Sequence, residues 1–151
     1  MNRICFIASF LLLAGCVPQN NIDYTAYRQS NPRSILVLPP LNNSPDIRAT
    51  YSFLSTVTQP LAEAGYYVFP VALVDQTFKE NGLPNPGEMH QAPLDKLREI
   101  FGADATLFIT IMQYGSAYRI LSSEVRVTAE ARLVDNRSGQ VLWQGRATAS
   151  N

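Results

Sequence analysis

The sequence has 151 residues, of which 46% are hydrophobic and 16% are charged, a composition that excludes intrinsic disorder for the chain as a whole. Twelve basic and twelve acidic residues give a formal net charge of zero, which removes the electrostatic argument for a nucleic-acid partner. Two Cys and one His are too few for a structural zinc site built from Cys and His alone. We therefore expect no metal, no cofactor and no nucleic acid.

The first sixteen residues resemble the signal peptide and lipobox of a bacterial lipoprotein. A cationic start at Arg3 precedes residues 4–14, an uncharged run of signal-peptide length that is too short to span a bilayer as a helix. Residues 13–16 (Leu-Ala-Gly-Cys) have the lipobox order of one aliphatic residue, two small residues and a cysteine. The resemblance implies cleavage between Gly15 and Cys16 and attachment of acyl chains such as palmitate to Cys16. The alternative is an ordinary secretory peptide whose cleavage site precedes a cysteine by chance.

The residues around Cys16 also predict where the protein is held. Val17 follows the cysteine, and in the lipoprotein sorting rule that this pattern resembles, a residue other than Asp directs release to the outer membrane. Two or three acyl chains anchor a protein stably, so we expect an outer-membrane lipoprotein that faces the periplasm. Processing discards Cys5, which leaves no thiol for catalysis or a disulfide. Residues 1–15 are the predicted signal, 16–33 the lipidated N-terminus and flexible tether, and 34–151 a single domain.

From residue 34 the pattern predicts alternating strands and helices. Residues 34–39 form a short apolar run that suits a strand buried on both faces. Residues 44–46 (Ser-Pro-Asp) predict a helix start, and Pro60 predicts a kink in that helix. A second strand is expected over residues 66–71, a helix over 72–81 and a loop over 83–92. The apolar face of the first helix is expected to hold Ile47, Tyr51, Leu54, Val57, Leu61 and Ala64.

The second half of the sequence predicts a helix over residues 93–101, a central strand over 105–114 and a tight connection at 115–117. Clean alternation then predicts a strand that faces a core on one side and water on the other, followed by a turn at 135–139 and a last strand over 140–149. The predicted fold class is α/β (α+β), a mixed sheet of about five strands covered by helices. The side chains expected to point inward are Val125, Val127, Ala129, Ala131, Leu133, Val141, Trp143, Gly145 and Ala147.

Several short segments together resemble known envelope proteins. The segments at residues 35–39 with Asn42 and Asn43, 102–104, 132–135 and 138–143 resemble the periplasmic fold shared by the curli-secretion lipoprotein CsgG and the N-terminal domain of TolB. Residues 60–67 (PLAEAGYY) and 101–104 (FGAD) resemble a meningococcal-type family of Gram-negative outer-membrane lipoproteins, and this likeness extends over residues 1–151. That family has no established activity, so the resemblance implies a fold and a location.

The same family resemblance raises a question of length. Its members usually continue beyond the Trp143 strand into a further helix that packs on the sheet, whereas this sequence stops at Asn151. We expect that a form lacking this helix exposes part of the inward sheet face and self-associates, which light scattering would detect. The resemblance and an exposed strand edge also favour a homodimer.

A few residues are candidates for chemistry or binding. Glu88 and His90 lie two apart in the long loop and would suit a general base or a pair of metal ligands; the alternative is a solvated loop with an incidental histidine. Asp104 and Asp135 adjoin turns, where carboxylates accept hydrogen bonds from backbone N–H groups. Asn42 follows the first strand, where open sheets often bind ligands. The possible interaction residues are Asn42, Asn43, Tyr66, Tyr67 and Trp143, with inward packing as the alternative for Trp143.

Three functions are compatible with these observations. The first is a non-catalytic, protein-binding lipoprotein in envelope assembly, transport or secretion, with other envelope proteins as partners. The second is an accessory subunit of a CsgG-like secretion complex, because the connection between Tyr114 and Tyr118 is too short to hold the strands of a pore itself. The third is an envelope hydrolase, which only Glu88 and His90 support. The sequence favours the first, and we expect no enzyme activity.

Overall fold

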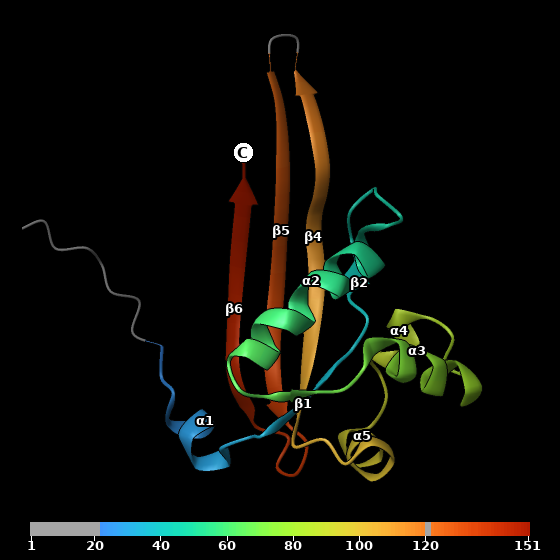
Figure 1. The fold of residues 1–151 in the computed structure, drawn as a ribbon, viewed down its shortest axis with the longest axis vertical. Coiled ribbons are helices and arrows are strands. Elements are labelled where there is room, and N and C mark those ends of the chain that lie inside the picture. The colour runs from blue at the N-terminus through green and yellow to red at the C-terminus, as the bar shows by residue number, and fades with distance from the viewer. Residues whose placement is uncertain (1–21, 120–121) are drawn as a thin grey trace, which may run out of the picture.

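The computed structural model describes residues 22–119 and 122–151, so the predicted signal peptide, Gly15 and Cys16 lie outside the described residues. The elements run in chain order from a short N-terminal helix to a C-terminal strand (Figure 1). The helices are α1 (Thr25–Ser30), α2 (Ala49–Glu63), α3 (Val71–Glu80), α4 (Pro86–Met89) and α5 (Leu94–Phe101). The strands are β1 (Ser34–Val37), β2 (Leu41–Asn42), β3 (Tyr67–Val68), β4 (Ala105–Arg119), β5 (Ser122–Asp135) and β6 (Val141–Ser150).

The strands form one mixed six-stranded sheet, which confirms the predicted fold class. The strand order is β3-β1-β4-β5-β6, and β2 pairs with β4 beyond the end of β1. β1 runs parallel to β3 and β4, whereas β4, β5 and β6 form an antiparallel meander. β6 is therefore one outer strand of the sheet, and the two-residue β3 is the other.

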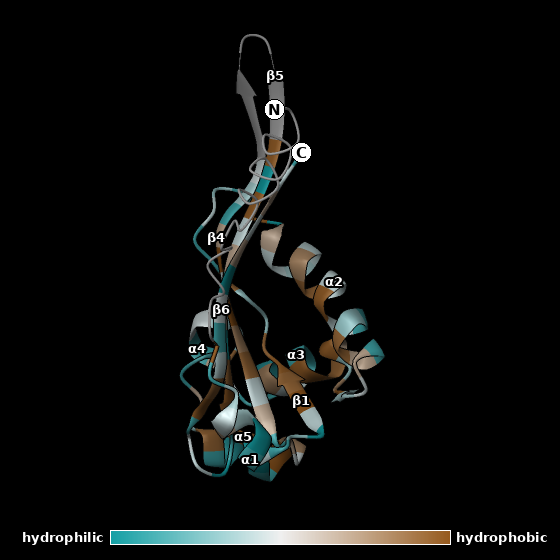
Figure 2. Cartoon of the chain, turned by 90° about the vertical axis from the view of Figure 1, so that its left-hand side faces the viewer, coloured by the Kyte–Doolittle hydropathy of each residue, from teal (hydrophilic) through white to brown (hydrophobic). Residues whose placement is uncertain are grey.

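Both faces of the sheet are covered near β1, because β1 is apolar and buried from Ile35 to Val37. Ile35 and Val37 point toward α2, and Leu36 and Leu38 point toward α3, α4 and α5. Figure 2 shows α2 and α4 on opposite sides of the strands. The α2 side of the core contains Leu54, Leu107, Ile109, Leu133 and Leu142, and the other side contains Val74, Phe78, Met89, Leu97 and Phe108. Beyond this double-covered region the meander extends past the helices (Figure 1).

The meander is longer than predicted. β4 continues through residues 115–117, where a tight connection was expected, and pairs with β5 as far as Arg119 and Ser122. Gly115, at φ +126°, keeps its partner Arg126 in the ladder, because glycine accepts a backbone conformation that other residues avoid. The predicted turn at 115–117 is therefore wrong, and it was suggested by a glycine that lies within a strand.

Three other segments differ from expectation. Residues 25–30 of the predicted tether form α1, which contacts β6. The predicted strand over 66–71 is reduced to Tyr67–Val68, since α3 begins at Val71. The predicted loop over 83–92 contains α4, where Asn85 Oδ1 accepts the Glu88 N–H at 3.1 Å and Pro86 occupies the first helical position.

Some side chains predicted to be buried are exposed. Val125 and Val141 are 42% and 43% exposed, and Ala147 is also exposed. A register shift at Leu133 and Val134 places Leu142 in the core in place of Val141, since a β-bulge reverses the alternation of the strand that carries it.

The first long helix starts later than predicted. α2 begins at Ala49 rather than at residues 44–46 and continues through Pro60 to Glu63. Ile47 consequently precedes the helix and is 89% exposed, and Tyr51 lies on the solvent side at 52%. The face of α2 that reaches the core carries Ala49, Thr50 and Leu54.

Candidate functional site

A hollow lies on the face of the meander beside α4, and we call it the arginine groove. It encloses about 550 Å³. Two cross-strand pairs form its floor, because Phe108 pairs with Arg132 and Thr110 with Glu130, two positions apart on the same face. Its lining residues are Leu41, His90, Phe108, Thr110, Glu130, Ala131, Arg132, Gln144, Gly145 and Arg146.

The groove carries more positive than negative charge. The Arg132 guanidinium lies 4.7 Å from the centroid of the Phe108 ring, a cation–π contact, and forms no ion pair within the described part of the chain. Arg146 Nη1 lies 3.1 Å from Glu130 Oε1, and both side chains remain about half exposed. The groove therefore has two guanidinium groups and one carboxylate, of which only Arg146 pairs with Glu130, and this excess of positive charge favours an anionic ligand group.

His90 closes the groove from the α4 side. Its Nε2 donates a hydrogen bond to the Pro39 carbonyl oxygen at 3.0 Å, and its ring contacts Phe108 edge-on at 5.4 Å. Burial lowers the pKa of His90, the hydrogen bond to Pro39 opposes this effect, and the charge of Arg132 adds to the lowering. His90 is consequently neutral at neutral pH, with Nδ1 as a hydrogen-bond acceptor.

Glu88 does not join His90 in one site. Glu88 lines a separate hollow of about 320 Å³ among α3, α4 and α5, together with Phe78, Leu83 and Phe101, and its Oε2 is buried without a hydrogen-bond partner in the described residues. The two residues proposed as a base or metal pair thus line different hollows. In the described ranges, 22–119 and 122–151, no three His, Cys, Asp or Glu side chains gather as a metal site would require.

The asparagines after β1 hold a loop. Asn42 Oδ1 accepts the N–H and Oγ–H of Ser44 at 2.9 and 2.6 Å, and its Nδ2 donates to the Asp46 carbonyl oxygen at 2.7 Å. The Asn43 N–H donates to the Ile111 carbonyl oxygen at 2.8 Å, next to β2. These contacts give both residues a structural role in the turn that leads to α2.

Two of the aromatic candidates, Tyr66 and Trp143, lie on the opposite side of the sheet from the arginine groove. Trp143 and Tyr66 line an apolar hollow of about 380 Å³ against α1, with Tyr24, Tyr27, Ile35, Leu107 and Leu133. The hydroxyl groups of Tyr27 and Tyr66 are hydrogen-bonded to each other. Tyr67 is 60% exposed and packs edge-on against Phe69 at 5.0 Å. Trp143 packs beside the core, the inward alternative raised by the sequence.

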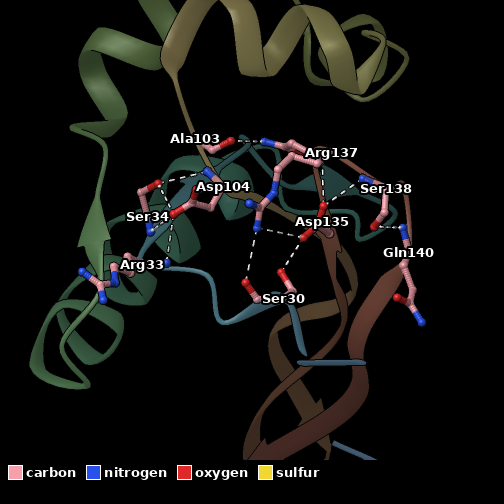
Figure 3. A network of polar contacts seen from close by, with 10 residues as sticks. Ser30, Arg33, Ser34, Ala103, Asp104, Asp135, Arg137, Ser138 and Gln140 are labelled. Atoms are coloured by element: carbon pink, nitrogen blue, oxygen red, sulfur yellow. Dashed lines mark hydrogen bonds and ion pairs between the residues drawn. The ribbon is translucent and has the colours of Figure 1, made fainter. Parts of the chain in front are cut away.

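Asp104 and Asp135 accept backbone N–H hydrogen bonds, as predicted, and both hold the segment that leads from α1 into β1 (Figure 3). Asp104 Oδ2 accepts the backbone N–H groups of Arg33 and Ser34 at 3.0 and 3.1 Å. Asp135 Oδ1 accepts the N–H groups of Arg137 and Ser138 at 2.8 and 2.9 Å, and Oδ2 accepts the Ser30 hydroxyl.

The pKa of Asp135 reflects this arrangement. Burial works to raise that pKa, but the hydrogen bonds from Ser30, Ser138 and Arg137 together outweigh it and lower the pKa to about 2. The carboxylate is therefore ionised at all ordinary pH values. It is a structural anion that holds the end of α1, and the Arg137 guanidinium lies 3.7 Å from its Oδ2.

Sequence reasoning missed the two arginines of the groove. Arg132 was assigned to the solvated face of its strand, and Arg146 was not singled out. The available signal was the row of charged and polar residues that alternates with alanines in β5. That row becomes a site only through Phe108 on β4 and His90 just after α4, which lie far from it in sequence.

The sequence and the fold are similar to those of known lipoproteins. The GNA1162-like lipoprotein family matches residues 22–151. A lipoprotein of Neisseria meningitidis serogroup B is 50% identical over 144 residues, which are 94% of this chain and 67% of that relative. The crystal structure of lipoprotein GNA1162 from Neisseria meningitidis matches with a TM-score of 0.76 at 52% identity, over 80% of this chain and 83% of that one.

Two more distant structures share the fold alone. The PelC dodecamer from Paraburkholderia phytofirmans matches with a TM-score of 0.56 at 14% identity, over 79% of this chain and 72% of that one. The LpoB C-terminal domain from Escherichia coli matches with a TM-score of 0.57 at 15% identity, over 79% of this chain and 83% of that one. The predicted likeness to CsgG and TolB stays a prediction.

A protein can be attached to a membrane by an acyl chain or by a helix that spans the bilayer. Among the residues that the structure describes, no helix combines the length and the apolar character needed to cross a membrane. The family resemblance drawn from residues 60–67 and 101–104 is confirmed by the match over residues 22–151 and by the 50% identical relative. The chain belongs to the GNA1162-like lipoprotein family.

Proposed function

We propose that this protein is a lipoprotein anchored in the outer membrane through Cys16, and that it acts without catalysis by binding other envelope proteins during assembly, transport or secretion. The observation that carries this proposal is the free outer edge of β6. Figure 1 shows β6 as the outermost strand of the meander, and no strand of the described ranges pairs with its outer side.

An edge strand of this kind is a ready binding surface. Every second residue of an edge strand directs its N–H and C=O groups away from the sheet, and these groups pair with an added strand. β6 spans ten residues, and the side chains from Arg146 to Ser150 are all exposed. The opposite edge, β3, offers two residues. The long β6 edge is therefore the surface that suits a protein partner best.

The anchor is tested by metabolic labelling with palmitate. We expect label on the wild-type protein and none on Cys16→Ala, because Cys16 is the proposed acylation site. Cys5→Ala is the matched control, since Cys5 lies in the proposed signal peptide, and it should keep the label. Equal labelling of wild type and Cys16→Ala would overturn the anchor.

Protein binding is tested by photo-crosslinking in cells. A photoreactive amino acid at Gln144 or Thr148 on β6 should give adducts with envelope proteins, whereas the same residue at the exposed Lys96 of α5 should give few. Adducts of equal yield from all three positions would argue against the β6 edge, and no adduct from any position would argue against protein binding altogether.

The predicted homodimer would use the same edge. Two copies that pair through β6 would bury the groups that another protein would otherwise bind, so the two modes compete. The positive charge on β6 favours pairing with a different protein over pairing with a second copy of this chain.

A further inference from the structure

We propose that the β6 edge and the adjoining arginine groove bind an extended segment of a partner protein as an added strand, in which acidic side chains alternate with apolar ones. This inference rests on the proposed protein-binding function and specifies the chemistry of the partner. It depends on what each face of β6 presents at its edge.

The two faces of β6 differ in charge and polarity. Gln144, Arg146 and Thr148 lie in register with Arg132, Glu130 and Thr128 on the groove face, and the Thr128 and Thr148 hydroxyls lie 3.1 Å apart. The alternate residues, Trp143, Gly145 and Ala147, face the other side. An added strand continues the pleat, so its own side chains must alternate in the same way.

On the groove face the edge favours carboxylates. Arg146 lies at the centre of the edge strand β6. Among the ion pairs of the described residues, Glu130 pairs with Arg146 alone. Arg132 lies one row away with its charge unbalanced by any ion pair in the described residues. The positive charge of Arg132 attracts an anion in the groove, because charges closer than the Debye length of about 8 Å at physiological salt are only partly screened. A carboxylate beside Arg146 would therefore gain a direct partner and a favourable field.

On the opposite face the edge favours apolar side chains. Gly145 and Ala147 present almost no side chain of their own, and the neighbouring Ala129 and Ala131 on β5 are only partly buried. Trp143 borders this surface at the α1 end. Apolar side chains of an added strand would cover these alanines and extend the α2 side of the core, which removes apolar area from water.

A second copy of this chain does not supply the required pattern. β6 carries no acidic residue between Val141 and Ser150. Antiparallel pairing of two β6 strands about their centres would also place Arg146 near its own copy, and like charges in facing positions destabilise a strand pair. The charge of the edge therefore favours a different, acidic partner segment over self-pairing.

The proposal is tested with fluorescent eight-residue peptides and the full chain in detergent micelles. A peptide of alternating glutamate and valine should bind at least about 10-fold more tightly than the glutamine–valine and lysine–valine peptides, as expected for loss of one hydrogen-bonded charge pair. Arg146→Gln should weaken its binding about 5-fold, and Glu130→Gln should strengthen it about 2-fold. Arg98→Gln on α5 is the matched control and should change nothing.

A second measurement tests the strand geometry without altering the protein. N-methylation of alternate peptide nitrogens should abolish binding in one register, where those N–H groups face β6, and should be tolerated in the other. Equal affinity of the glutamate and glutamine peptides, no effect of Arg146→Gln, equal loss in both methylation registers, or a stable dimer that excludes the peptide would each overturn the proposal. If one of these results were found but β6 still gave crosslinks to envelope proteins in cells, the proposed function would stand. Only the proposal of an acidic partner strand would then be refuted.

Discussion

At the scale of single residues, Asp135 ties the N-terminal helix to the meander. It is 3% exposed and accepts hydrogen bonds from residues that lie on both sides of it in space, Ser30 on α1 and Arg137 and Ser138 in the turn. Asn136 beside it is also buried and donates to the Ala103 carbonyl oxygen at 2.9 Å. The sequence predicted the turn and the capping by Asp135, because both follow from local turn chemistry. It did not predict Ser30 as a partner, since that contact spans 105 positions.

Replacing Asp135 should make the free energy of unfolding less dependent on pH in the acidic range. Its folded pKa of about 2 lies below the ordinary value of an aspartate, 3.8, so its contribution is fully present above about pH 4 and is lost as the pH falls toward 2. Asp135→Asn should lower the free energy of unfolding by roughly 1–3 kcal/mol at pH 7, and its difference from wild type should shrink between pH 4 and pH 2. Urea denaturation across this range measures both effects.

Asp75, a partly buried residue of α3, is the matched control for this change. It pairs with Lys79 on the surface of α3, and surface pairs contribute about 0–1 kcal/mol. Asp75→Asn should therefore alter stability much less than Asp135→Asn. A difference between wild type and Asp135→Asn that stays constant from pH 7 to pH 2 would contradict the assigned role of the carboxylate.

Gly145 is required because Trp143 covers it. A Cβ at this position would lie 2.6 Å from Trp143 Cζ2, closer than carbon atoms approach. Gly145→Ala should cost about 1–3 kcal/mol through overpacking and should shift the fluorescence of Trp143, the single Trp of the chain. Ala147→Ser, at an exposed position of the same face, should leave the emission unchanged; an unshifted spectrum for Gly145→Ala would show that the ring lies elsewhere.

At the scale of elements, α1 shows how a six-residue helix persists. Isolated helices of this length are unstable in water, so α1 depends on contacts with the rest of the fold. Tyr27 packs beside the core, and its hydroxyl is hydrogen-bonded to that of Tyr66. Arg137 Nη2 donates a hydrogen bond to the Ser30 carbonyl oxygen at 3.3 Å. The polar composition of residues 16–33 suggested a tether, because the sequence alone does not reveal these distant partners.

Tyr66→Phe should loosen α1 alone. The hydrogen bond with Tyr66, together with burial, raises the pKa of Tyr27 to about 12. Since the folded pKa exceeds the unfolded value near 10, this contribution is present below pH 10 and is lost as the pH rises toward 12. In Tyr66→Phe the tyrosinate absorbance of Tyr27 should appear at lower pH, and amides of residues 25–30 should exchange faster. Tyr51→Phe is the control, and an unchanged titration in Tyr66→Phe would refute the pairing.

The strands show where alternation in a sequence is a reliable guide. It predicted the polar face of β5 correctly, because Glu130 and Arg132 both lie on the groove side. It failed in β6, where Leu142 replaces Val141 in the core. A β-bulge depends on how the partner strand pairs, so no pattern within one strand reveals it.

At the scale of the whole molecule, the sheet has one half covered by helices and one half that extends beyond them (Figure 2). The covered half, around β1, was predictable because an apolar run on both faces requires helices on both sides. The anchor at the membrane stays a prediction from residues 13–16, which lie outside the described residues. The arginine groove was not, because charged residues on a strand usually meet water, and only the packing of His90 and Phe108 gives these arginines a defined setting.

The central claim is that the free β6 edge binds another envelope protein as an added strand. It is tested most directly by amide hydrogen exchange over residues 143–150, measured in isolated outer membranes and again in the protein purified in detergent. Exchange of amides that point outward from the edge reports whether another strand covers them. We predict slower exchange of this segment in the membranes than in the purified protein, with residues 94–101 of α5 unchanged as the internal reference. Equal exchange of residues 143–150 in the two samples would contradict the claim.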